Sequence, residues 1–68
     1  MADRVILIGW TENGQRKEVH GKQTQFDKRL FLWTGMLGGE VMSMKDARKT
    51  MRENGLTKIS THRIQSMF

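Results

Sequence analysis

The sequence contains no cysteine, no proline and no tyrosine. Without cysteine, neither a disulfide nor a thiolate metal site can supplement the thin core of a 68-residue chain. Without proline, no segment is excluded from a helix or strand on that ground. Acids are also few, because 7 Asp and Glu accompany 12 Lys and Arg, for a net charge of +5. This charge favours nucleic acid, an acidic protein surface or an anionic membrane as a partner.

Long hydrophobic runs are absent as well. The least charged stretch, residues 30–39, is far shorter than the ~20 residues that span a bilayer. The N-terminus, Met1-Ala2-Asp3-Arg4, lacks the cationic start and apolar run of a signal peptide. Cysteine-free composition suits a reducing cytoplasm. We therefore expect residues 1–68 to form a single small ordered domain that is cytoplasmic and has no membrane partner.

Catalytic and metal-binding patterns are missing too. His20 and His62 are the only histidines, and Glu18 and Asp27 lie at no recognisable ligand spacing from them. The chain has no nucleophile elbow and no phosphate-binding loop. The sequence therefore predicts a protein that is not an enzyme and needs neither a cofactor nor a metal.

The distribution of apolar residues predicts strands in the first part of the chain. Residues 4–10 are typical of a strand that is apolar on both faces and therefore central. Asn13-Gly14 follows directly and predicts a two-residue type I′ turn, which would place Ile8 opposite Val19. The polar segment 16–22 would then pair with the first strand and form an edge of the sheet. One face of this hairpin would carry Ile6, Ile8, Trp10 and Val19, and the other Val5, Leu7, Arg16, Glu18 and His20.

Three further elements complete the predicted α+β fold. Residues 29–37 predict a third strand interrupted by glycine, residues 43–54 a helix, and residues 56–67 a last strand with a bulge or bend. The order is strand, strand, strand, helix, strand. The simplest arrangement is a small antiparallel sheet of three or four strands with one helix packed on a face. Because one helix covers one face only, exposed apolar surface on the other would be typical of a partner or dimer interface.

The predicted helix has the clearest end signals in the chain. Ser43 followed by Asp46 is a variant of the capping box. Gly55 fits the left-handed position that ends a helix, and Leu56 after it can contact Met51. An apolar stripe, which we expect to be buried, consists of Met44, Ala47 and Met51.

A second stripe on the same helix is cationic. It consists of Lys45, Arg48, Lys49 and Arg52, at positions i, i+3, i+4 and i+7, about 130° from the apolar stripe. Lys49 can pair with Asp46 or Glu53, whereas the other three have no acid between them at helical spacing. Candidate extensions of this basic patch are Arg16 and Lys17 beside the turn and Lys58 and Arg63 on the last strand. The alternative is a solvated helix face that binds nothing.

The two tryptophans are also candidates for stacking on nucleic-acid bases. In a domain this small, large aromatic side chains are more often needed in the core. We therefore expect both Trp10 and Trp33 to be buried.

Some of these residues resemble the three-stranded arm-site DNA-binding domains of tyrosine integrases. The resemblance rests on the strand ending at Trp10, the Asn13-Gly14 turn, Arg16-Lys17 and the helix opening at residues 43–47, and covers most of residues 4–54. It implies a sheet that reads DNA with a helix packed behind it. The segment 23–42 and the strand after the helix depart from that pattern. Size and element order also resemble small phage proteins that block host enzymes or CRISPR complexes, without a shared motif.

Two hypotheses of different classes follow. The first is a small basic protein that engages nucleic acid through the helix cations. The second is a phage-type inhibitor or adaptor that docks on a host protein or nucleoprotein complex, such as a CRISPR complex or a polymerase, and blocks its nucleic-acid site. A homodimer through the uncovered sheet face is a third arrangement, in which charge serves solubility only.

Overall fold

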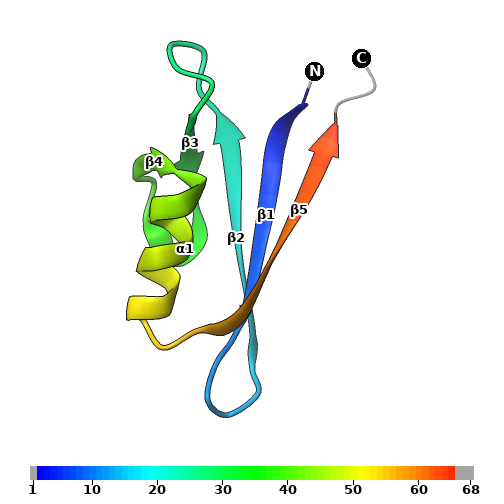
Figure 1. Cartoon of the computed structure of the whole chain (residues 1–68), viewed down its shortest axis with the longest axis vertical. Helices are drawn as coiled ribbons and strands as arrows, with labels where there is room; N and C mark the ends of the chain where they lie inside the picture. The colour runs from blue at the N-terminus through cyan, green and yellow to red at the C-terminus, as the bar shows by residue number, and fades with distance from the viewer. Residues whose placement is uncertain (1, 66–68) are drawn as a thin grey trace.

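A computed structural model describes residues 2–65 and arranges them as a five-stranded sheet with one α-helix (Figure 1). The elements are β1 (Ala2–Trp10), β2 (Arg16–Gln23), β3 (Leu30–Trp33), the 3-10 helix η1 (Gly35–Leu37), β4 (Val41–Ser43), α1 (Met44–Glu53) and β5 (Thr57–Gln65). The strand order is β4-β3-β2-β1-β5, and every neighbouring pair is antiparallel. The predicted α+β class, with one helix on an antiparallel sheet, is confirmed. The sheet has five strands instead of three or four, because β4 was not foreseen.

The sheet order confirms one of two expectations about the first hairpin. β1 is central, between β2 and β5. The expectation that β2 forms an edge is wrong, because Gly21–Gln23 pair with β3. Trp33 of β3 lies against Gly21, whose missing side chain leaves room for the indole. The edges of the sheet are β4 and β5.

The turn between β1 and β2 has three residues instead of two. The Gly14 N–H donates to the Thr11 carbonyl (2.9 Å), and the Thr11 N–H donates to the Gln15 carbonyl (2.9 Å). Gly14 has a φ of 82°. This is the three-residue hairpin loop, in which a type I turn is followed by a left-handed glycine. The Thr11 hydroxyl accepts the Gln15 N–H (3.0 Å) and stabilises the longer loop.

The longer loop shifts the register by one residue. Ile8 lies opposite Glu18, Leu7 opposite Val19 and Trp10 opposite Arg16, so the predicted pairing of Ile8 with Val19 is wrong. When the register shifts by one residue, each residue of β2 moves to the other face relative to the residues of β1. Val19 therefore shares its face with Val5 and Leu7, instead of with Ile6, Ile8 and Trp10.

The core lies between α1 and the face that carries Leu7 and Val19, which we call the covered face. Its buried side chains are Val5, Leu7, Val19, Phe31, Trp33, Leu37, Ala47, Met51 and Leu56. The opposite face, with Ile6, Ile8 and Trp10, is the open face. Trp33 is completely buried, as expected, and its Nε1–H donates to the Met42 carbonyl (2.9 Å). Trp10 is 38% exposed, so the expectation that it belongs to the core is wrong.

The helix follows its sequence signals closely. The Ser43 side chain accepts the Asp46 N–H (3.2 Å) at the first turn. At the other end, the Gly55 N–H donates to the Arg52 carbonyl (3.0 Å) and the Leu56 N–H to the Met51 carbonyl (3.1 Å). These bonds form a Schellman motif, with Gly55 at a φ of 88°. The predicted burial of Ala47 and Met51 is confirmed, whereas Met44, the third member of the apolar stripe, is half-buried.

The predicted bulge in the last strand is present. Ile8 pairs with Ser60 and Trp10 with Thr57, so β5 has one residue more than β1 over this interval. Lys58, inside the bulge, has a left-handed φ of 55°. Residues 66–67, the predicted end of this strand, lie outside the described residues.

Candidate nucleic-acid interface

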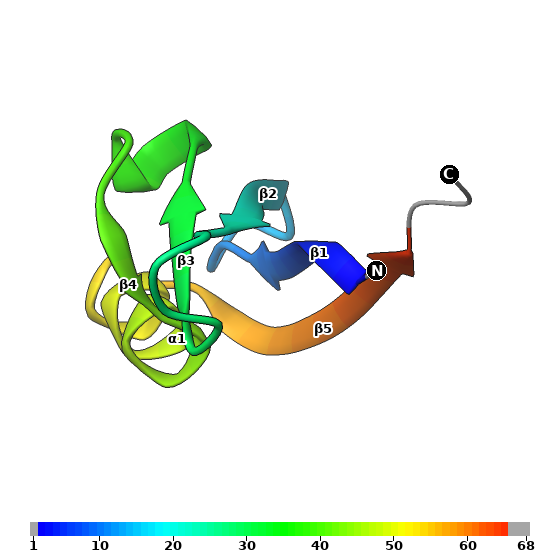
Figure 2. The ribbon, with the colours of Figure 1, turned by 90° about the horizontal axis from the view of Figure 1, so that it is seen from above.

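The basic stripe, defined as Lys45, Arg48, Lys49 and Arg52, lies on the flank of α1 that is turned toward β5. Nη1 of Arg48 donates to Oγ1 of Thr61 in β5 (2.9 Å). On the opposite flank, the Thr50 hydroxyl contacts the sulfur of Met42 just before the helix (3.9 Å). Figure 2 shows the arrangement from above: α1 lies beside β3 and β4, and β5 extends from the helix toward the other side of the molecule.

The four stripe cations have no acidic partner among residues 4–64. The ion pairs in that range involve Arg16, His20 and Arg29. Lys49 forms an ion pair with neither Asp46 nor Glu53, so the expected partial neutralisation is not present. Arg48 is half-buried and the other three cations are exposed. The stripe is therefore a cationic surface whose charge the described part of the chain does not neutralise.

The four proposed extensions of the patch lie in different places. Arg63 lies opposite Val5 on the covered face, two residues after the Thr61 that Arg48 contacts, so it is on the side of the stripe. Lys17 lies opposite Gly9 on the same face but on β2. Lys58 lines a cavity at the hairpin end of the molecule, beside Trp10. Arg16, opposite Trp10, is on the open face and is separated from the stripe.

Arg16 is also neutralised within its own face. Its guanidinium pairs with the Glu18 carboxylate, and Nε2 of His20 contacts the other carboxylate oxygen (3.1 Å). The hydrogen bond from His20 and the charge of Arg16 lower the pKa of Glu18 below its usual value. These three side chains form a local charge network that is typical of an exposed strand surface.

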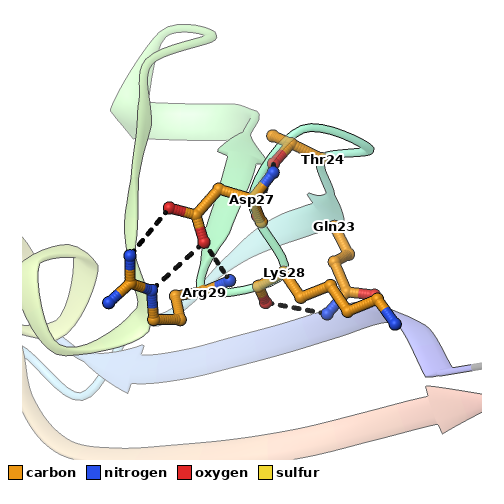
Figure 3. A network of polar contacts seen from close by, with 5 residues as sticks. All are labelled: Gln23, Thr24, Asp27, Lys28 and Arg29. Atoms are coloured by element: carbon orange, nitrogen blue, oxygen red, sulfur yellow. Dashed lines mark hydrogen bonds and ion pairs between the residues drawn. The ribbon is translucent and has the colours of Figure 1, made fainter.

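Another cation is neutralised in the loop between β2 and β3 (Figure 3). The Asp27 carboxylate accepts the Arg29 backbone N–H (2.9 Å) and the guanidinium Nε–H (3.2 Å). Hydrogen bonds from Arg29 lower the pKa of Asp27. The Thr24 hydroxyl donates to the Asp27 carbonyl (2.6 Å), and Nε2 of Gln23 donates to the Lys28 carbonyl (2.8 Å). The polar groups of this loop therefore bind one another. Because few of them remain to bind a ligand, the loop is a poor candidate site.

Sequence reasoning missed two cations on the open face. Arg4 and Lys22 lie directly opposite each other on β1 and β2, and both line a cavity of about 370 Å³. Their proximity depends on a register that the Asn13-Gly14 signal predicted wrongly. The signal that favours the correct register is Thr11, whose hydroxyl can close a three-residue loop.

Residues 2–65 offer neither a metal site nor a membrane-spanning helix. That range has no group of three or more His, Cys, Asp or Glu side chains placed to hold a metal ion. It has no helix with the length and apolar character needed to cross a membrane. Comparison with known proteins finds no matching family model, no similar curated protein and no similar solved structure.

Proposed function

We propose that this chain is a small non-enzymatic binding protein that engages nucleic acid through the basic stripe of α1. The observation that carries the proposal is the absence of acidic partners for all four stripe cations among the described residues. Phosphates would supply the missing counter-charge, and contacts of this kind give most of the affinity in sequence-independent binding.

The dimensions of the stripe suit a phosphate backbone. From Lys45 to Arg52 the helix rises about 10 Å, at ~1.5 Å per residue. One strand of a duplex places a phosphate about every 3.4 Å along the axis, so the stripe spans about three phosphates. The acids of the helix, Asp46 and Glu53, lie about 100° around the axis from the centre of the stripe, and Lys49 is the stripe cation nearest to them.

The second candidate is the phage-type inhibitor or adaptor that docks on a host protein or nucleoprotein complex and blocks its nucleic-acid site. Exposed apolar side chains on the open face favour it. Leu32, Val41 and Ile64 are each more than 40% exposed. Exposed apolar side chains gathered on one face are typical of protein interfaces.

Fluorescence anisotropy with labelled single-stranded DNA, duplex DNA and RNA tests the proposal. We expect Arg48→Glu with Arg52→Glu to weaken binding by about tenfold for each lost contact. Because Arg48 also contacts Thr61, Lys45→Glu with Arg52→Glu is a second variant that keeps this bond. Arg4→Glu with Lys22→Glu is the matched control, since it makes the same charge change on the open face.

Circular dichroism establishes that each variant is folded. Normal oligonucleotide binding by both folded stripe variants would contradict the nucleic-acid proposal. Binding of a lysate partner that survives nuclease treatment and does not depend on the stripe would favour the inhibitor or adaptor instead.

A further inference from the structure

The open face carries a row of five residues, one from each strand, which the register aligns side by side. We call this the cross-strand row, and in sheet order it consists of Val41, Leu32, Lys22, Arg4 and Ile64. The third and fourth residues are cations, with two aliphatic residues on one side of them and one on the other. Leu32 is 41% exposed, Val41 45% and Ile64 44%. The row therefore presents positive charge between two exposed apolar ends.

The surface along this row is hollowed. The cavity of about 370 Å³ lies over its middle, where Arg4, Lys22 and Leu32 meet Ile6 and Ile64. A second cavity, of about 390 Å³, shares Lys22 and Leu32 and continues to Val41 and Phe26. Phe26 is 77% exposed. The two cavities are therefore neighbours on the open face, and cationic, polar and apolar side chains line them.

Among residues 4–64, no carboxylate lines either cavity. Glu18 lies on the same face of β2, but Arg16 and His20 hold its carboxylate. Among the side chains of residues 4–64, neither Arg4 nor Lys22 has an ion pair or hydrogen-bond partner. A ligand that fits this surface must therefore bring its own negative charge.

This charge distribution disfavours a second copy of the chain as the occupant. Two open faces packed on one another would bring Arg4 and Lys22 close to the same cations of the partner copy, and like charges at an interface are costly. The open face also fits a nucleic acid poorly. The row itself contains no aromatic side chain on which a base can stack. The aromatic rings that line the two cavities are those of Phe26, in the second cavity, and His20, which contacts Glu18, so bases have no series of stacking partners along the row.

We propose that the open face docks an acidic segment of a partner protein in which carboxylates are flanked by aliphatic side chains. The carboxylates bind Arg4 and Lys22 through charge-assisted hydrogen bonds. The aliphatic side chains cover Leu32 and Ile64, which exposed phosphates would not do. Five strands at about 4.8 Å give a row about 19 Å long, the length of about six extended residues.

This inference is independent of the proposed function, because the row and the basic stripe are on opposite faces of the sheet. One molecule can then hold nucleic acid on α1 and an acidic protein segment on the open face. The chain would act as an adaptor between the two.

Selection of random 12-residue peptides displayed on phage, with the immobilised whole chain as bait, tests the inference. The Arg4→Glu, Lys22→Glu variant serves for counter-selection. We expect the enriched peptides to combine Asp or Glu with Leu, Ile, Val or Phe. A synthetic enriched peptide should bind the unmodified chain at least about tenfold more tightly than the Arg4→Glu, Lys22→Glu variant or the Leu32→Ser variant. The Arg48→Glu, Arg52→Glu variant is the control and should bind the peptide normally.

Amide NMR shifts show where the peptide binds, and we expect them on all five strands, β1 to β5. Enrichment of basic peptides, no enrichment over the counter-selected variant, or shifts confined to α1 would overturn the inference. A loss of oligonucleotide binding in Arg4→Glu, Lys22→Glu as large as in the stripe variants would assign the face to nucleic acid instead. Analytical ultracentrifugation that finds a dimer disrupted by Leu32→Ser would assign it to a second copy.

Discussion

Gly21 is the residue on which the packing of the largest core side chain depends. A Cβ atom at this position would lie 2.5 Å from Cζ3, 2.7 Å from Cε3 and 2.8 Å from Cη2 of Trp33. The indole cannot move away without loss, because it is completely buried and its Nε1–H is bound to the Met42 carbonyl. The absence of a side chain at Gly21 therefore allows β3 to pair with β2 while Trp33 fills the core.

We expect Gly21→Ala to lower the free energy of unfolding by about 1–3 kcal/mol, the usual cost of overpacking a core. Urea unfolding followed by circular dichroism measures this change. The same substitution combined with Trp33→Phe is the control, since the smaller ring leaves more space above residue 21. An alanine penalty that is equal in both backgrounds would show that contact with the indole is not its cause.

The contrast between the two tryptophans shows what sequence reasoning can predict for single residues. Both were expected in the core, and only Trp33 is buried. The small size of the domain correctly predicted that a large aromatic side chain would be buried. Which one it buries depends on which face α1 covers. The extra residue in the hairpin loop puts Val19 on the face of Leu7, and α1 covers that face, whereas Trp10 lies on the opposite face of β1.

Among the elements, α1 was predicted most accurately because its signals are local. Ser43, Asp46 and Gly55 act through hydrogen bonds within a few residues of themselves. β4 gave no signal, because a strand of three residues is defined by its pairing with β3 and not by its own pattern. The Asn13-Gly14 signal correctly predicted a hairpin. It fits both a two-residue loop and the end of a three-residue loop, so it left the register open.

The end of the helix offers a test in which backbone conformation is separated from packing. Gly55 has a φ of 88°, and a Cβ atom there would meet nothing within 4 Å. We therefore expect Gly55→Ala to cost about 1–2 kcal/mol from left-handed strain alone. Gly55→Asn should cost less, because asparagine tolerates this conformation better. Urea unfolding of both variants measures the difference, and equal losses would point to a cause other than backbone strain.

At the scale of the whole molecule, the candidate surfaces differ in how far the sequence reveals them. The basic stripe follows from the spacing of four residues on one helix, so it could be predicted before the fold was known. The cross-strand row joins residues 4, 22, 32, 41 and 64, and it requires the correct register of four strand pairs. The chain also separates its free cations between two faces, which net charge alone does not show.

This separation predicts different responses to salt. If all four stripe cations contact phosphates, the log–log slope of duplex affinity against salt should be about −3.6, at ~0.9 per contact, or about 150-fold between 50 and 200 mM. Reversing Arg48 and Arg52 should reduce the slope by about 1.8. Anisotropy titrations over this salt range measure both values.

Peptide binding on the open face should be less sensitive to salt, because only two cations take part and the apolar contacts are not screened. A duplex slope shallower than about −1 would mean that the stripe contributes at most one phosphate contact, and nucleic-acid binding through α1 would then be wrong.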